Sequence, residues 1–247
     1  MASPLHQFEI HPLVSLPMVG GYDVSFTNAA LFMMLAVLGT VLFMMLPFRH
    51  RHEVPTRFQA LAELYYRFVA DLARDTAGSD ARPFFPFIFS LFSFVLFGNM
   101  LGMLPFSFTF TSHIIVTFAL AIFIFVMVTV VGFVRHGTHF FALFIPEGLP
   151  DHPLSKLLLL PLIFIIELFS YLIRPITLSM RLGANMMAGH IMLKLVVGFV
   201  AIAGIWGIAP FLLSFAIIGF EFFVAGLQAY IFTLMTCVYL KDALHLH

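Results

Sequence analysis

Five long apolar stretches constrain the fold of this 247-residue chain more than any other feature of its sequence. They cover residues 26–48, 84–104, 114–134, 157–200 and 205–240. A helix needs about 20 apolar residues to cross the hydrocarbon core of a bilayer, and each stretch is long enough. The chain is 62% hydrophobic and 10% charged, whereas a soluble domain carries about 25% charged residues. The sequence therefore predicts an all-α integral membrane protein, built as a single multi-pass membrane domain over residues 1–247.

Charge, cysteine and histidine content argue against several classes of protein. The formal net charge is zero, which argues against a nucleic-acid partner. The single cysteine, Cys237, excludes an internal disulfide and a cysteine-built metal site. His136 and His139 lie three residues apart with no third ligand nearby in the sequence. We therefore expect no metal site and no cofactor.

The segment between the first two stretches is expected to form an amphipathic helix over residues 55–77. Apolar residues recur on one face at helical spacing. They are Phe58, Leu61, Ala62, Tyr65, Phe68, Val69 and Leu72. On the other face, Glu63–Arg67 and Arg67–Asp71 are opposite-charge pairs four residues apart. This pattern is typical of an interfacial helix rather than of a membrane span, and a surface helix without special function accounts for it.

The basic residues predict an orientation in the membrane. Of the twelve Lys and Arg, nine lie outside the spans, and five spans place all nine on the same side. They are Arg49, Arg51, Arg57, Arg67, Arg74, Arg82, Arg135, Lys156 and Lys241. Because basic loops stay on the cytoplasmic side, we expect the segment 1–25 and the N-terminus outside and the C-terminus in the cytoplasm. Residues 1–25 contain no Lys or Arg and thus lack the basic region of a secretory signal peptide.

The last two stretches are too long for upright membrane helices. As a helix, residues 157–200 would measure about 66 Å, whereas the hydrocarbon core is only about 30 Å thick. We therefore expect residues 157–240 to form a long helix hairpin that is strongly tilted or nearly horizontal, with possible break points at Pro161, Pro175 and Pro210. A short re-entrant hairpin hidden within each stretch is the alternative.

Arg181 is the residue least expected in such surroundings. A guanidinium group stays charged at any relevant pH, and a charge at membrane depth costs at least about 2.5–3.5 kcal/mol. On a helix, Glu167, Arg174 and Asn185 fall on the same side as Arg181. His190 and Lys194 point roughly the opposite way, and Ser214, Glu221 and Gln228 recur every seven residues in the last stretch. This alignment predicts a functional polar pathway.

A single antiparallel register brings these polar groups together in pairs. If His190 lies beside Glu221, then Arg181 lies close to Gln228, deeper in the membrane. Carboxylate and imidazole groups can pass protons, whereas an arginine cannot, so the pattern predicts a proton pathway that is interrupted at Arg181. Two simpler interpretations stay open: His190–Glu221 as a buried polar pair, and Asn185 and Gln228 as interhelical hydrogen-bonding groups.

Three separated motifs resemble the a subunit of F-type ATP synthases. They are NMLGMLP at residues 99–105, ELFSYLIRPITLSMRLGANMMAGH at 167–190 and LQAYIFTLMTCVYLKDALHLH at 227–247. The similarity covers nearly the whole chain. It implies a non-catalytic transport subunit of the membrane sector, whose partners are the c-ring, the peripheral-stalk b and b′ subunits, other subunits of the complex and the lipid bilayer. It also implies the bacterial cell inner membrane, or alternatively the mitochondrial one.

The resemblance also implies roles for individual residues. Arg181 matches the family's essential arginine, which separates two offset half-channels and favours the ionised c-ring carboxylate. The remaining pathway residues are Glu167, Asn185, His190, Glu221 and Gln228, and Arg174 and Ser214 are candidate channel-lining residues. Arg174 could instead snorkel to the membrane surface. A secondary ion transporter is the alternative function, although no related halves are evident in the sequence.

Overall fold

The structure is a computed structural model, and it describes residues 10–14, 25–48, 56–104, 107–137, 139–140, 153–202 and 207–245. Most of the predicted outer segment 1–25 lies outside these ranges, as do Arg49 and Arg51. The predicted fold class is confirmed, because five helices are long and apolar enough to cross a membrane. The strands β1 (Pro12–Val14) and β2 (Phe26–Thr27) form a small antiparallel ribbon before the first of these helices.

The first half of the chain contains two apolar helices and the amphipathic helix between them. α1 (Asn28–Met45) begins at Thr27, whose hydroxyl accepts the amide hydrogen of Ala30 and caps the helix, and the short η2 (Leu46–Phe48) follows it. α2 (Arg57–Ala77) is the amphipathic helix, and it ends at Gly78, whose φ of 79° favours glycine. η3 (Ser79–Phe84) then leads into α3 (Phe85–Gly102).

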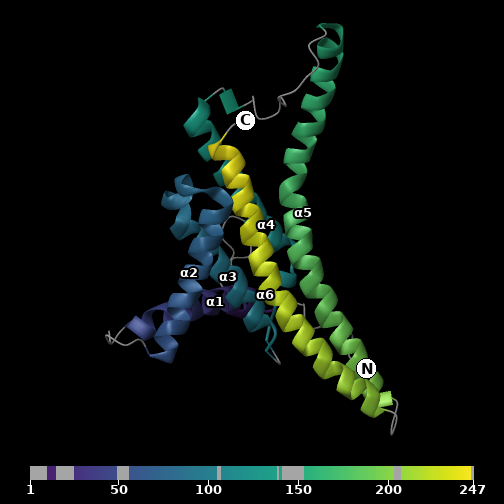
Figure 1. The fold of residues 1–247 in the computed structure, drawn as a ribbon. Coiled ribbons are helices and arrows are strands. Elements are labelled where there is room, and N and C mark those ends of the chain that lie inside the picture. The colour runs from purple at the N-terminus through teal and green to yellow at the C-terminus, as the bar shows by residue number, and fades with distance from the viewer. Residues whose placement is uncertain are drawn as a thin grey trace.

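The second half contains the three remaining long helices. η4 (Phe110–Ser112) precedes α4 (Ile114–His136), and the last two are α5 (Pro153–Ile202) and α6 (Ile208–Leu244). Within the described residues α5 is one continuous helix of 50 residues that runs through Pro161 and Pro175, so the predicted break points do not interrupt it. The re-entrant alternative is therefore wrong for this unit. Figure 1 shows instead that the axis of α5 changes direction part-way along its length.

α6 is the helix around which the others assemble. It contacts α2, α3, α4 and α5, and its buried residues join those of the other four helices in one apolar core. Figure 1 shows α6 running beside α5, which lies at the side of the molecule. α5 packs on α4 and α6 and leaves apolar side chains such as Phe169 and Met180 exposed.

Successive long helices begin at opposite ends of the bundle, as an odd number of membrane crossings requires. At one end, Phe32 near the start of α1 contacts Phe108, just beyond α3. At the other end, Asp80 of η3 pairs with Arg135 at the end of α4 at 2.8 Å. His136 also lies there, with its Nε2 3.2 Å from the carbonyl oxygen of Leu244 in α6.

α2 is amphipathic, but its apolar residues do not share one environment. Ala62, Val69 and Leu72 are buried in the core, whereas Phe58 is 47% exposed. Tyr65 is held more firmly, because its hydroxyl lies 2.8 Å from that of Ser93 and its ring packs on Phe89 and Phe92. Burial raises the pKa of Tyr65 to about 12.

Candidate functional site

His190 and Glu221 form a buried polar pair between α5 and α6. Their exposed fractions are 5% and 4%, and His190 Nδ1 lies 3.3 Å from Glu221 Oε1. Both carboxylate oxygens lack a hydrogen bond within the described part of the chain, so the ring is the polar group that faces them. Gly189 makes room for this approach, because a Cβ there would lie 2.8 Å from Glu221 Oε1. The predicted contact between these two side chains is confirmed.

A threonine that the sequence analysis did not single out completes this cluster. Thr109 Oγ1 lies 2.9 Å from His190 Nε2 and 3.1 Å from the carbonyl oxygen of Gly102. Thr109 is itself buried, with 2% exposure. The segment after α3 folds back onto the glycines of that helix: the ring of Phe110 covers Gly98, and Thr109 packs against Gly102. Side chains at these two glycines would push the threonine away from His190.

Arg181 lies on the opposite, exposed side of α5. Asn185, one turn further on, is exposed as well, and so are Ala184 and Ala188. Gly183 is different, because it is buried against α4 with Thr117 Oγ1 3.2 Å from the position of a Cβ. Gly183 and Gly189 therefore allow close packing within the chain.

The polar stripe of α6 faces inward. Ser214, Glu221 and Gln228 are all buried, as their spacing of seven residues predicts. The hydroxyl of Ser214 donates to the carbonyl oxygen of Phe211 in its own helix at 2.6 Å. Arg181 is exposed whereas Gln228 is 5% exposed, and no hydrogen bond joins the two among the described residues. The register thus brings one predicted pair into contact and not the other.

Arg174 links α5 to the end of α6. Its Nη1 lies 3.1 Å from Asp242 Oδ2, and its guanidinium carbon lies 5.2 Å from the centre of the Tyr171 ring and 4.8 Å from that of Tyr239. Tyr171 is anchored in turn, with its hydroxyl 2.6 Å from that of Thr129 in α4. Arg174 is therefore held between α5 and α6.

Glu167 lies closer to the N-terminal end of α5 than Arg174 and Arg181 do. It is half-buried, and the described residues give it no ion pair. With about 1.5 Å of rise per residue, it lies about 21 Å before Arg181, and His190 lies about 14 Å beyond Arg181. The polar residues of α5 thus cover about 35 Å, somewhat more than the hydrocarbon core of a bilayer.

Known proteins supply the identity that this geometry alone leaves open. The family described as "ATP synthase A chain" matches residues 30–241. The protein named "ATP synthase subunit a" of Rhodospirillum rubrum is 52% identical over 248 residues and covers 100% of both chains. Its namesake in Parvibaculum lavamentivorans is 52% identical over 98% of this chain and 93% of its own, and that of Paramagnetospirillum magneticum is 50% identical over 100% of both.

The chain belongs to the ATP synthase A chain family. It is therefore a multi-pass membrane subunit of the membrane sector of F-type ATP synthase and is not catalytic by itself. This membership decides against a secondary ion transporter, the alternative that the sequence had left open.

Three polar residues with contacts between segments of the chain, Asn99, Thr109 and Asp242, were not singled out in the sequence. Asn99 is fully buried, and its Nδ2 donates to the carbonyl oxygen of Ala225 in α6 at 3.1 Å, while its Oδ1 has no partner in the described structure. An amide within an apolar helix is a signal that could have revealed it. Asp242 and Thr109 give no such signal, because they stand among other polar residues at the ends of apolar stretches.

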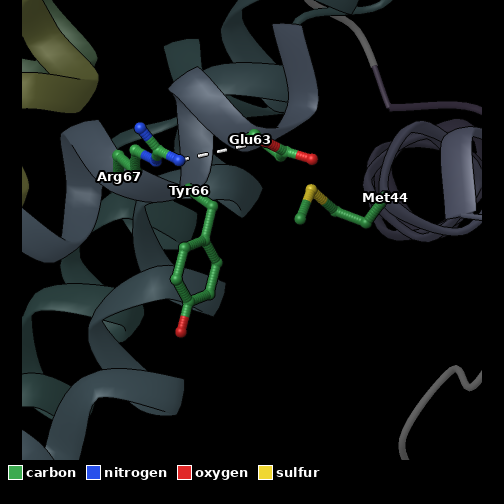
Figure 2. Close-up of a pocket in the computed structure, with 4 residues that line it drawn as sticks. All are labelled: Met44, Glu63, Tyr66 and Arg67. Atoms are coloured by element: carbon green, nitrogen blue, oxygen red, sulfur yellow. Dashed lines mark ion pairs between the residues drawn. The ribbon is translucent and has the colours of Figure 1, made fainter. Parts of the chain in front are cut away.

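A pocket elsewhere in the molecule does not belong to this site. Figure 2 shows Glu63, Tyr66 and Arg67 of α2 opposite Met44 of α1, around a space of about 420 Å³. The Glu63–Arg67 pair is confirmed at 4.0 Å, but the arginine side chain is 75% exposed. An exposed ion pair of this kind contributes little to stability. We therefore interpret the pocket that it borders as a surface feature of the amphipathic helix.

Proposed function

We propose that this chain is the proton-translocating stator of its ATP synthase, with two offset half-channels that load and unload carboxylates of the c-ring. The observation that carries the proposal is the exposure of Arg181 on an apolar helix. A permanent cation is costly against lipid, so this face of α5 requires a partner with a negative charge. A c-ring carboxylate supplies that charge, and the exposed Ala184 and Ala188 allow a close approach.

Arg181 is proposed to separate the two half-channels. Its charge favours the ionised carboxylate and repels a passing hydronium ion, so protons move past it only when the ring carries them. The outer half-channel lies near His190 and Glu221, and the cytoplasmic one near Glu167. Asn185 and Gln228 are proposed to order water or side chains beside Arg181, and Arg174 and Ser214 to line the channels.

The remaining partners and the orientation are part of the same proposal. Besides the c-ring, the chain is proposed to contact the peripheral-stalk b and b′ subunits, other subunits of the complex and lipid. The end of the bundle that holds Arg135 and Lys241 is proposed to face the cytoplasm, with the N-terminus outside. The bacterial relatives support a bacterial inner membrane, with the mitochondrial inner membrane as the alternative.

The test is Arg181→Ala in the complete ATP synthase, measured in inverted membrane vesicles. ATP-driven proton pumping should disappear, while passive proton leakage through complexes stripped of their catalytic sector persists or rises. Arg67→Ala is the control, because it removes another exposed arginine from an ion pair that contributes little. Normal pumping by Arg181→Ala, with assembled complex confirmed on native gels, would contradict the proposed barrier.

A further inference from the structure

The hydroxyl of Thr109 lies between two groups with different hydrogen-bonding abilities. On one side is the carbonyl oxygen of Gly102, which can only accept, and on the other is His190 Nε2. A hydroxyl has a single hydrogen. It satisfies both contacts only if it donates to the carbonyl oxygen and accepts the hydrogen carried by Nε2. If the hydroxyl donated its hydrogen to Nε2 instead, Thr109 Oγ1 and the carbonyl oxygen of Gly102 would face each other at 3.1 Å with no hydrogen between them.

This arrangement determines which nitrogen of His190 is basic. With the hydrogen on Nε2, a neutral ring presents the lone pair of Nδ1, and Nδ1 is the atom that lies 3.3 Å from Glu221 Oε1. One proton can then lie on either side of this contact. It is on the carboxyl group when the ring is neutral, and it is on Nδ1 when imidazolium faces carboxylate.

We propose that Thr109 is a positioning residue for proton transfer, which holds His190 in the tautomer whose Nδ1 faces Glu221. The inference rests on the proposed function, since it names the group that orients the outer half-channel pair. Gly102 contributes to the same arrangement, because only a residue without a side chain lets Thr109 reach its carbonyl oxygen. Further titratable groups at this end of the described structure include Lys194, one turn from His190, and His113 at the start of α4.

The test compares Thr109→Val with Thr109→Ser in the complete ATP synthase. Valine has nearly the shape of threonine but no hydroxyl, whereas serine keeps the hydroxyl. We expect ATP-driven pumping to fall about tenfold in the valine variant, the factor that one buried hydrogen bond is worth in a rate, and to stay within about threefold in the serine variant. Equal pumping by the two variants would overturn the proposal.

A control separates positioning from general support of the segment. Ser112 donates a buried hydrogen bond of 2.6 Å to the backbone oxygen of Thr109, not to its side-chain hydroxyl. Ser112→Ala should therefore pump at least as well as Thr109→Ser. A tenfold loss in this control as well would show that the intact segment matters rather than the Thr109 hydroxyl, and would also overturn the proposal.

The tautomer can be observed directly by ¹⁵N NMR of the complex labelled in histidine, with the His190 signals assigned by their loss in His190→Gln. The unmodified protein should show hydrogen on Nε2 and a bare Nδ1, and Thr109→Val should populate the other tautomer. Hydrogen on Nδ1 of the neutral ring in the unmodified protein would overturn the inference. If the NMR result contradicts the tautomer but Arg181→Ala still loses pumping, the proposed function stands and only the role of Thr109 is wrong. Normal pumping in Arg181→Ala would instead contradict the proposed function itself.

Discussion

Two groups of polar residues, about two and a half turns apart on α5, differ in how they are satisfied. His190 is buried, and this chain itself supplies its partners, Glu221 and Thr109. Arg181 and Asn185 are exposed on the other side of the helix, where the chain provides no ion pair for the arginine within the described residues. The first group finds its contacts within the subunit, and the second is proposed to need a partner from another subunit. Substitutions at the first should act through this fold alone, and those at the second through assembly.

The largest expected effect concerns the buried pair. Glu221→Gln should reduce ATP-driven pumping by about 100-fold or more, because an amide cannot take up and release the proton that the pair is proposed to pass. Exchanging the two residues, with His190→Glu and Glu221→His together, should retain more pumping than either single change. Losses that simply add in the double variant would show that the two side chains do not act together.

The exposed face should respond to added bulk as well as to the loss of the Arg181 charge. Ala188→Leu should lower pumping about tenfold, because it adds three carbon atoms where a partner is proposed to approach closely, while the subunit still inserts normally. Ala119→Leu is the matched control, since Ala119 is an exposed alanine on a different helix, α4. Pumping assays and the yield of assembled complex on native gels would measure both variants. Equal behaviour of the two would contradict a partner at the Arg181 face.

A single methyl group should disturb the buried pair from within. Gly189→Ala places a Cβ 2.8 Å from Glu221 Oε1, so the carboxylate must move away from His190. We expect a destabilisation of about 1–3 kcal/mol and a several-fold loss of pumping. Gly198→Ala, in the same helix but with nothing within 4 Å of its Cβ position, should leave pumping unchanged. Equal stability and equal pumping of Gly189→Ala and Gly198→Ala would show that the His190–Glu221 pair tolerates displacement.

The smallest effect is expected at the ion pair between Arg174 and Asp242. Asp242→Asn removes the ion pair of Arg174 but leaves the cation between its two tyrosine rings, so stability should fall by about 1 kcal/mol or less. Glu63→Gln, which breaks the weaker pair of α2, should have an effect below about 0.5 kcal/mol. Heating the solubilised complex and measuring retention of this subunit would rank the two. A larger loss of stability in Glu63→Gln than in Asp242→Asn would contradict this ranking.

Helix-level features of the molecule were predictable because they depend on local periodicity. Apolar length predicted five spans, and the seven-residue spacing predicted that Ser214, Glu221 and Gln228 share one stripe of their helix, which the structure buries. The contact of His190 with Glu221 followed from an antiparallel register.

Features that depend on connections between helices were not predictable. The side of α5 on which Gly183 packs is set by α4, and the position of Thr109 is set by glycines of α3 that admit the returning chain. Neither relation leaves a repeating pattern in the sequence. The same is true of Arg174, because Asp242 lies 68 residues away from it.

The central position of α6 has a mechanical consequence. A helix that touched only one neighbour would swing aside when pushed, but α5 leans on α6 and α4, and α6 in turn is braced by α2, α3 and α4. A sideways force on the exposed face of α5 is therefore distributed over four other helices before it reaches lipid. If a moving c-ring presses on α5, as proposed, the packing of α6 should let the whole helix bundle resist that force, although α5 lies at its side.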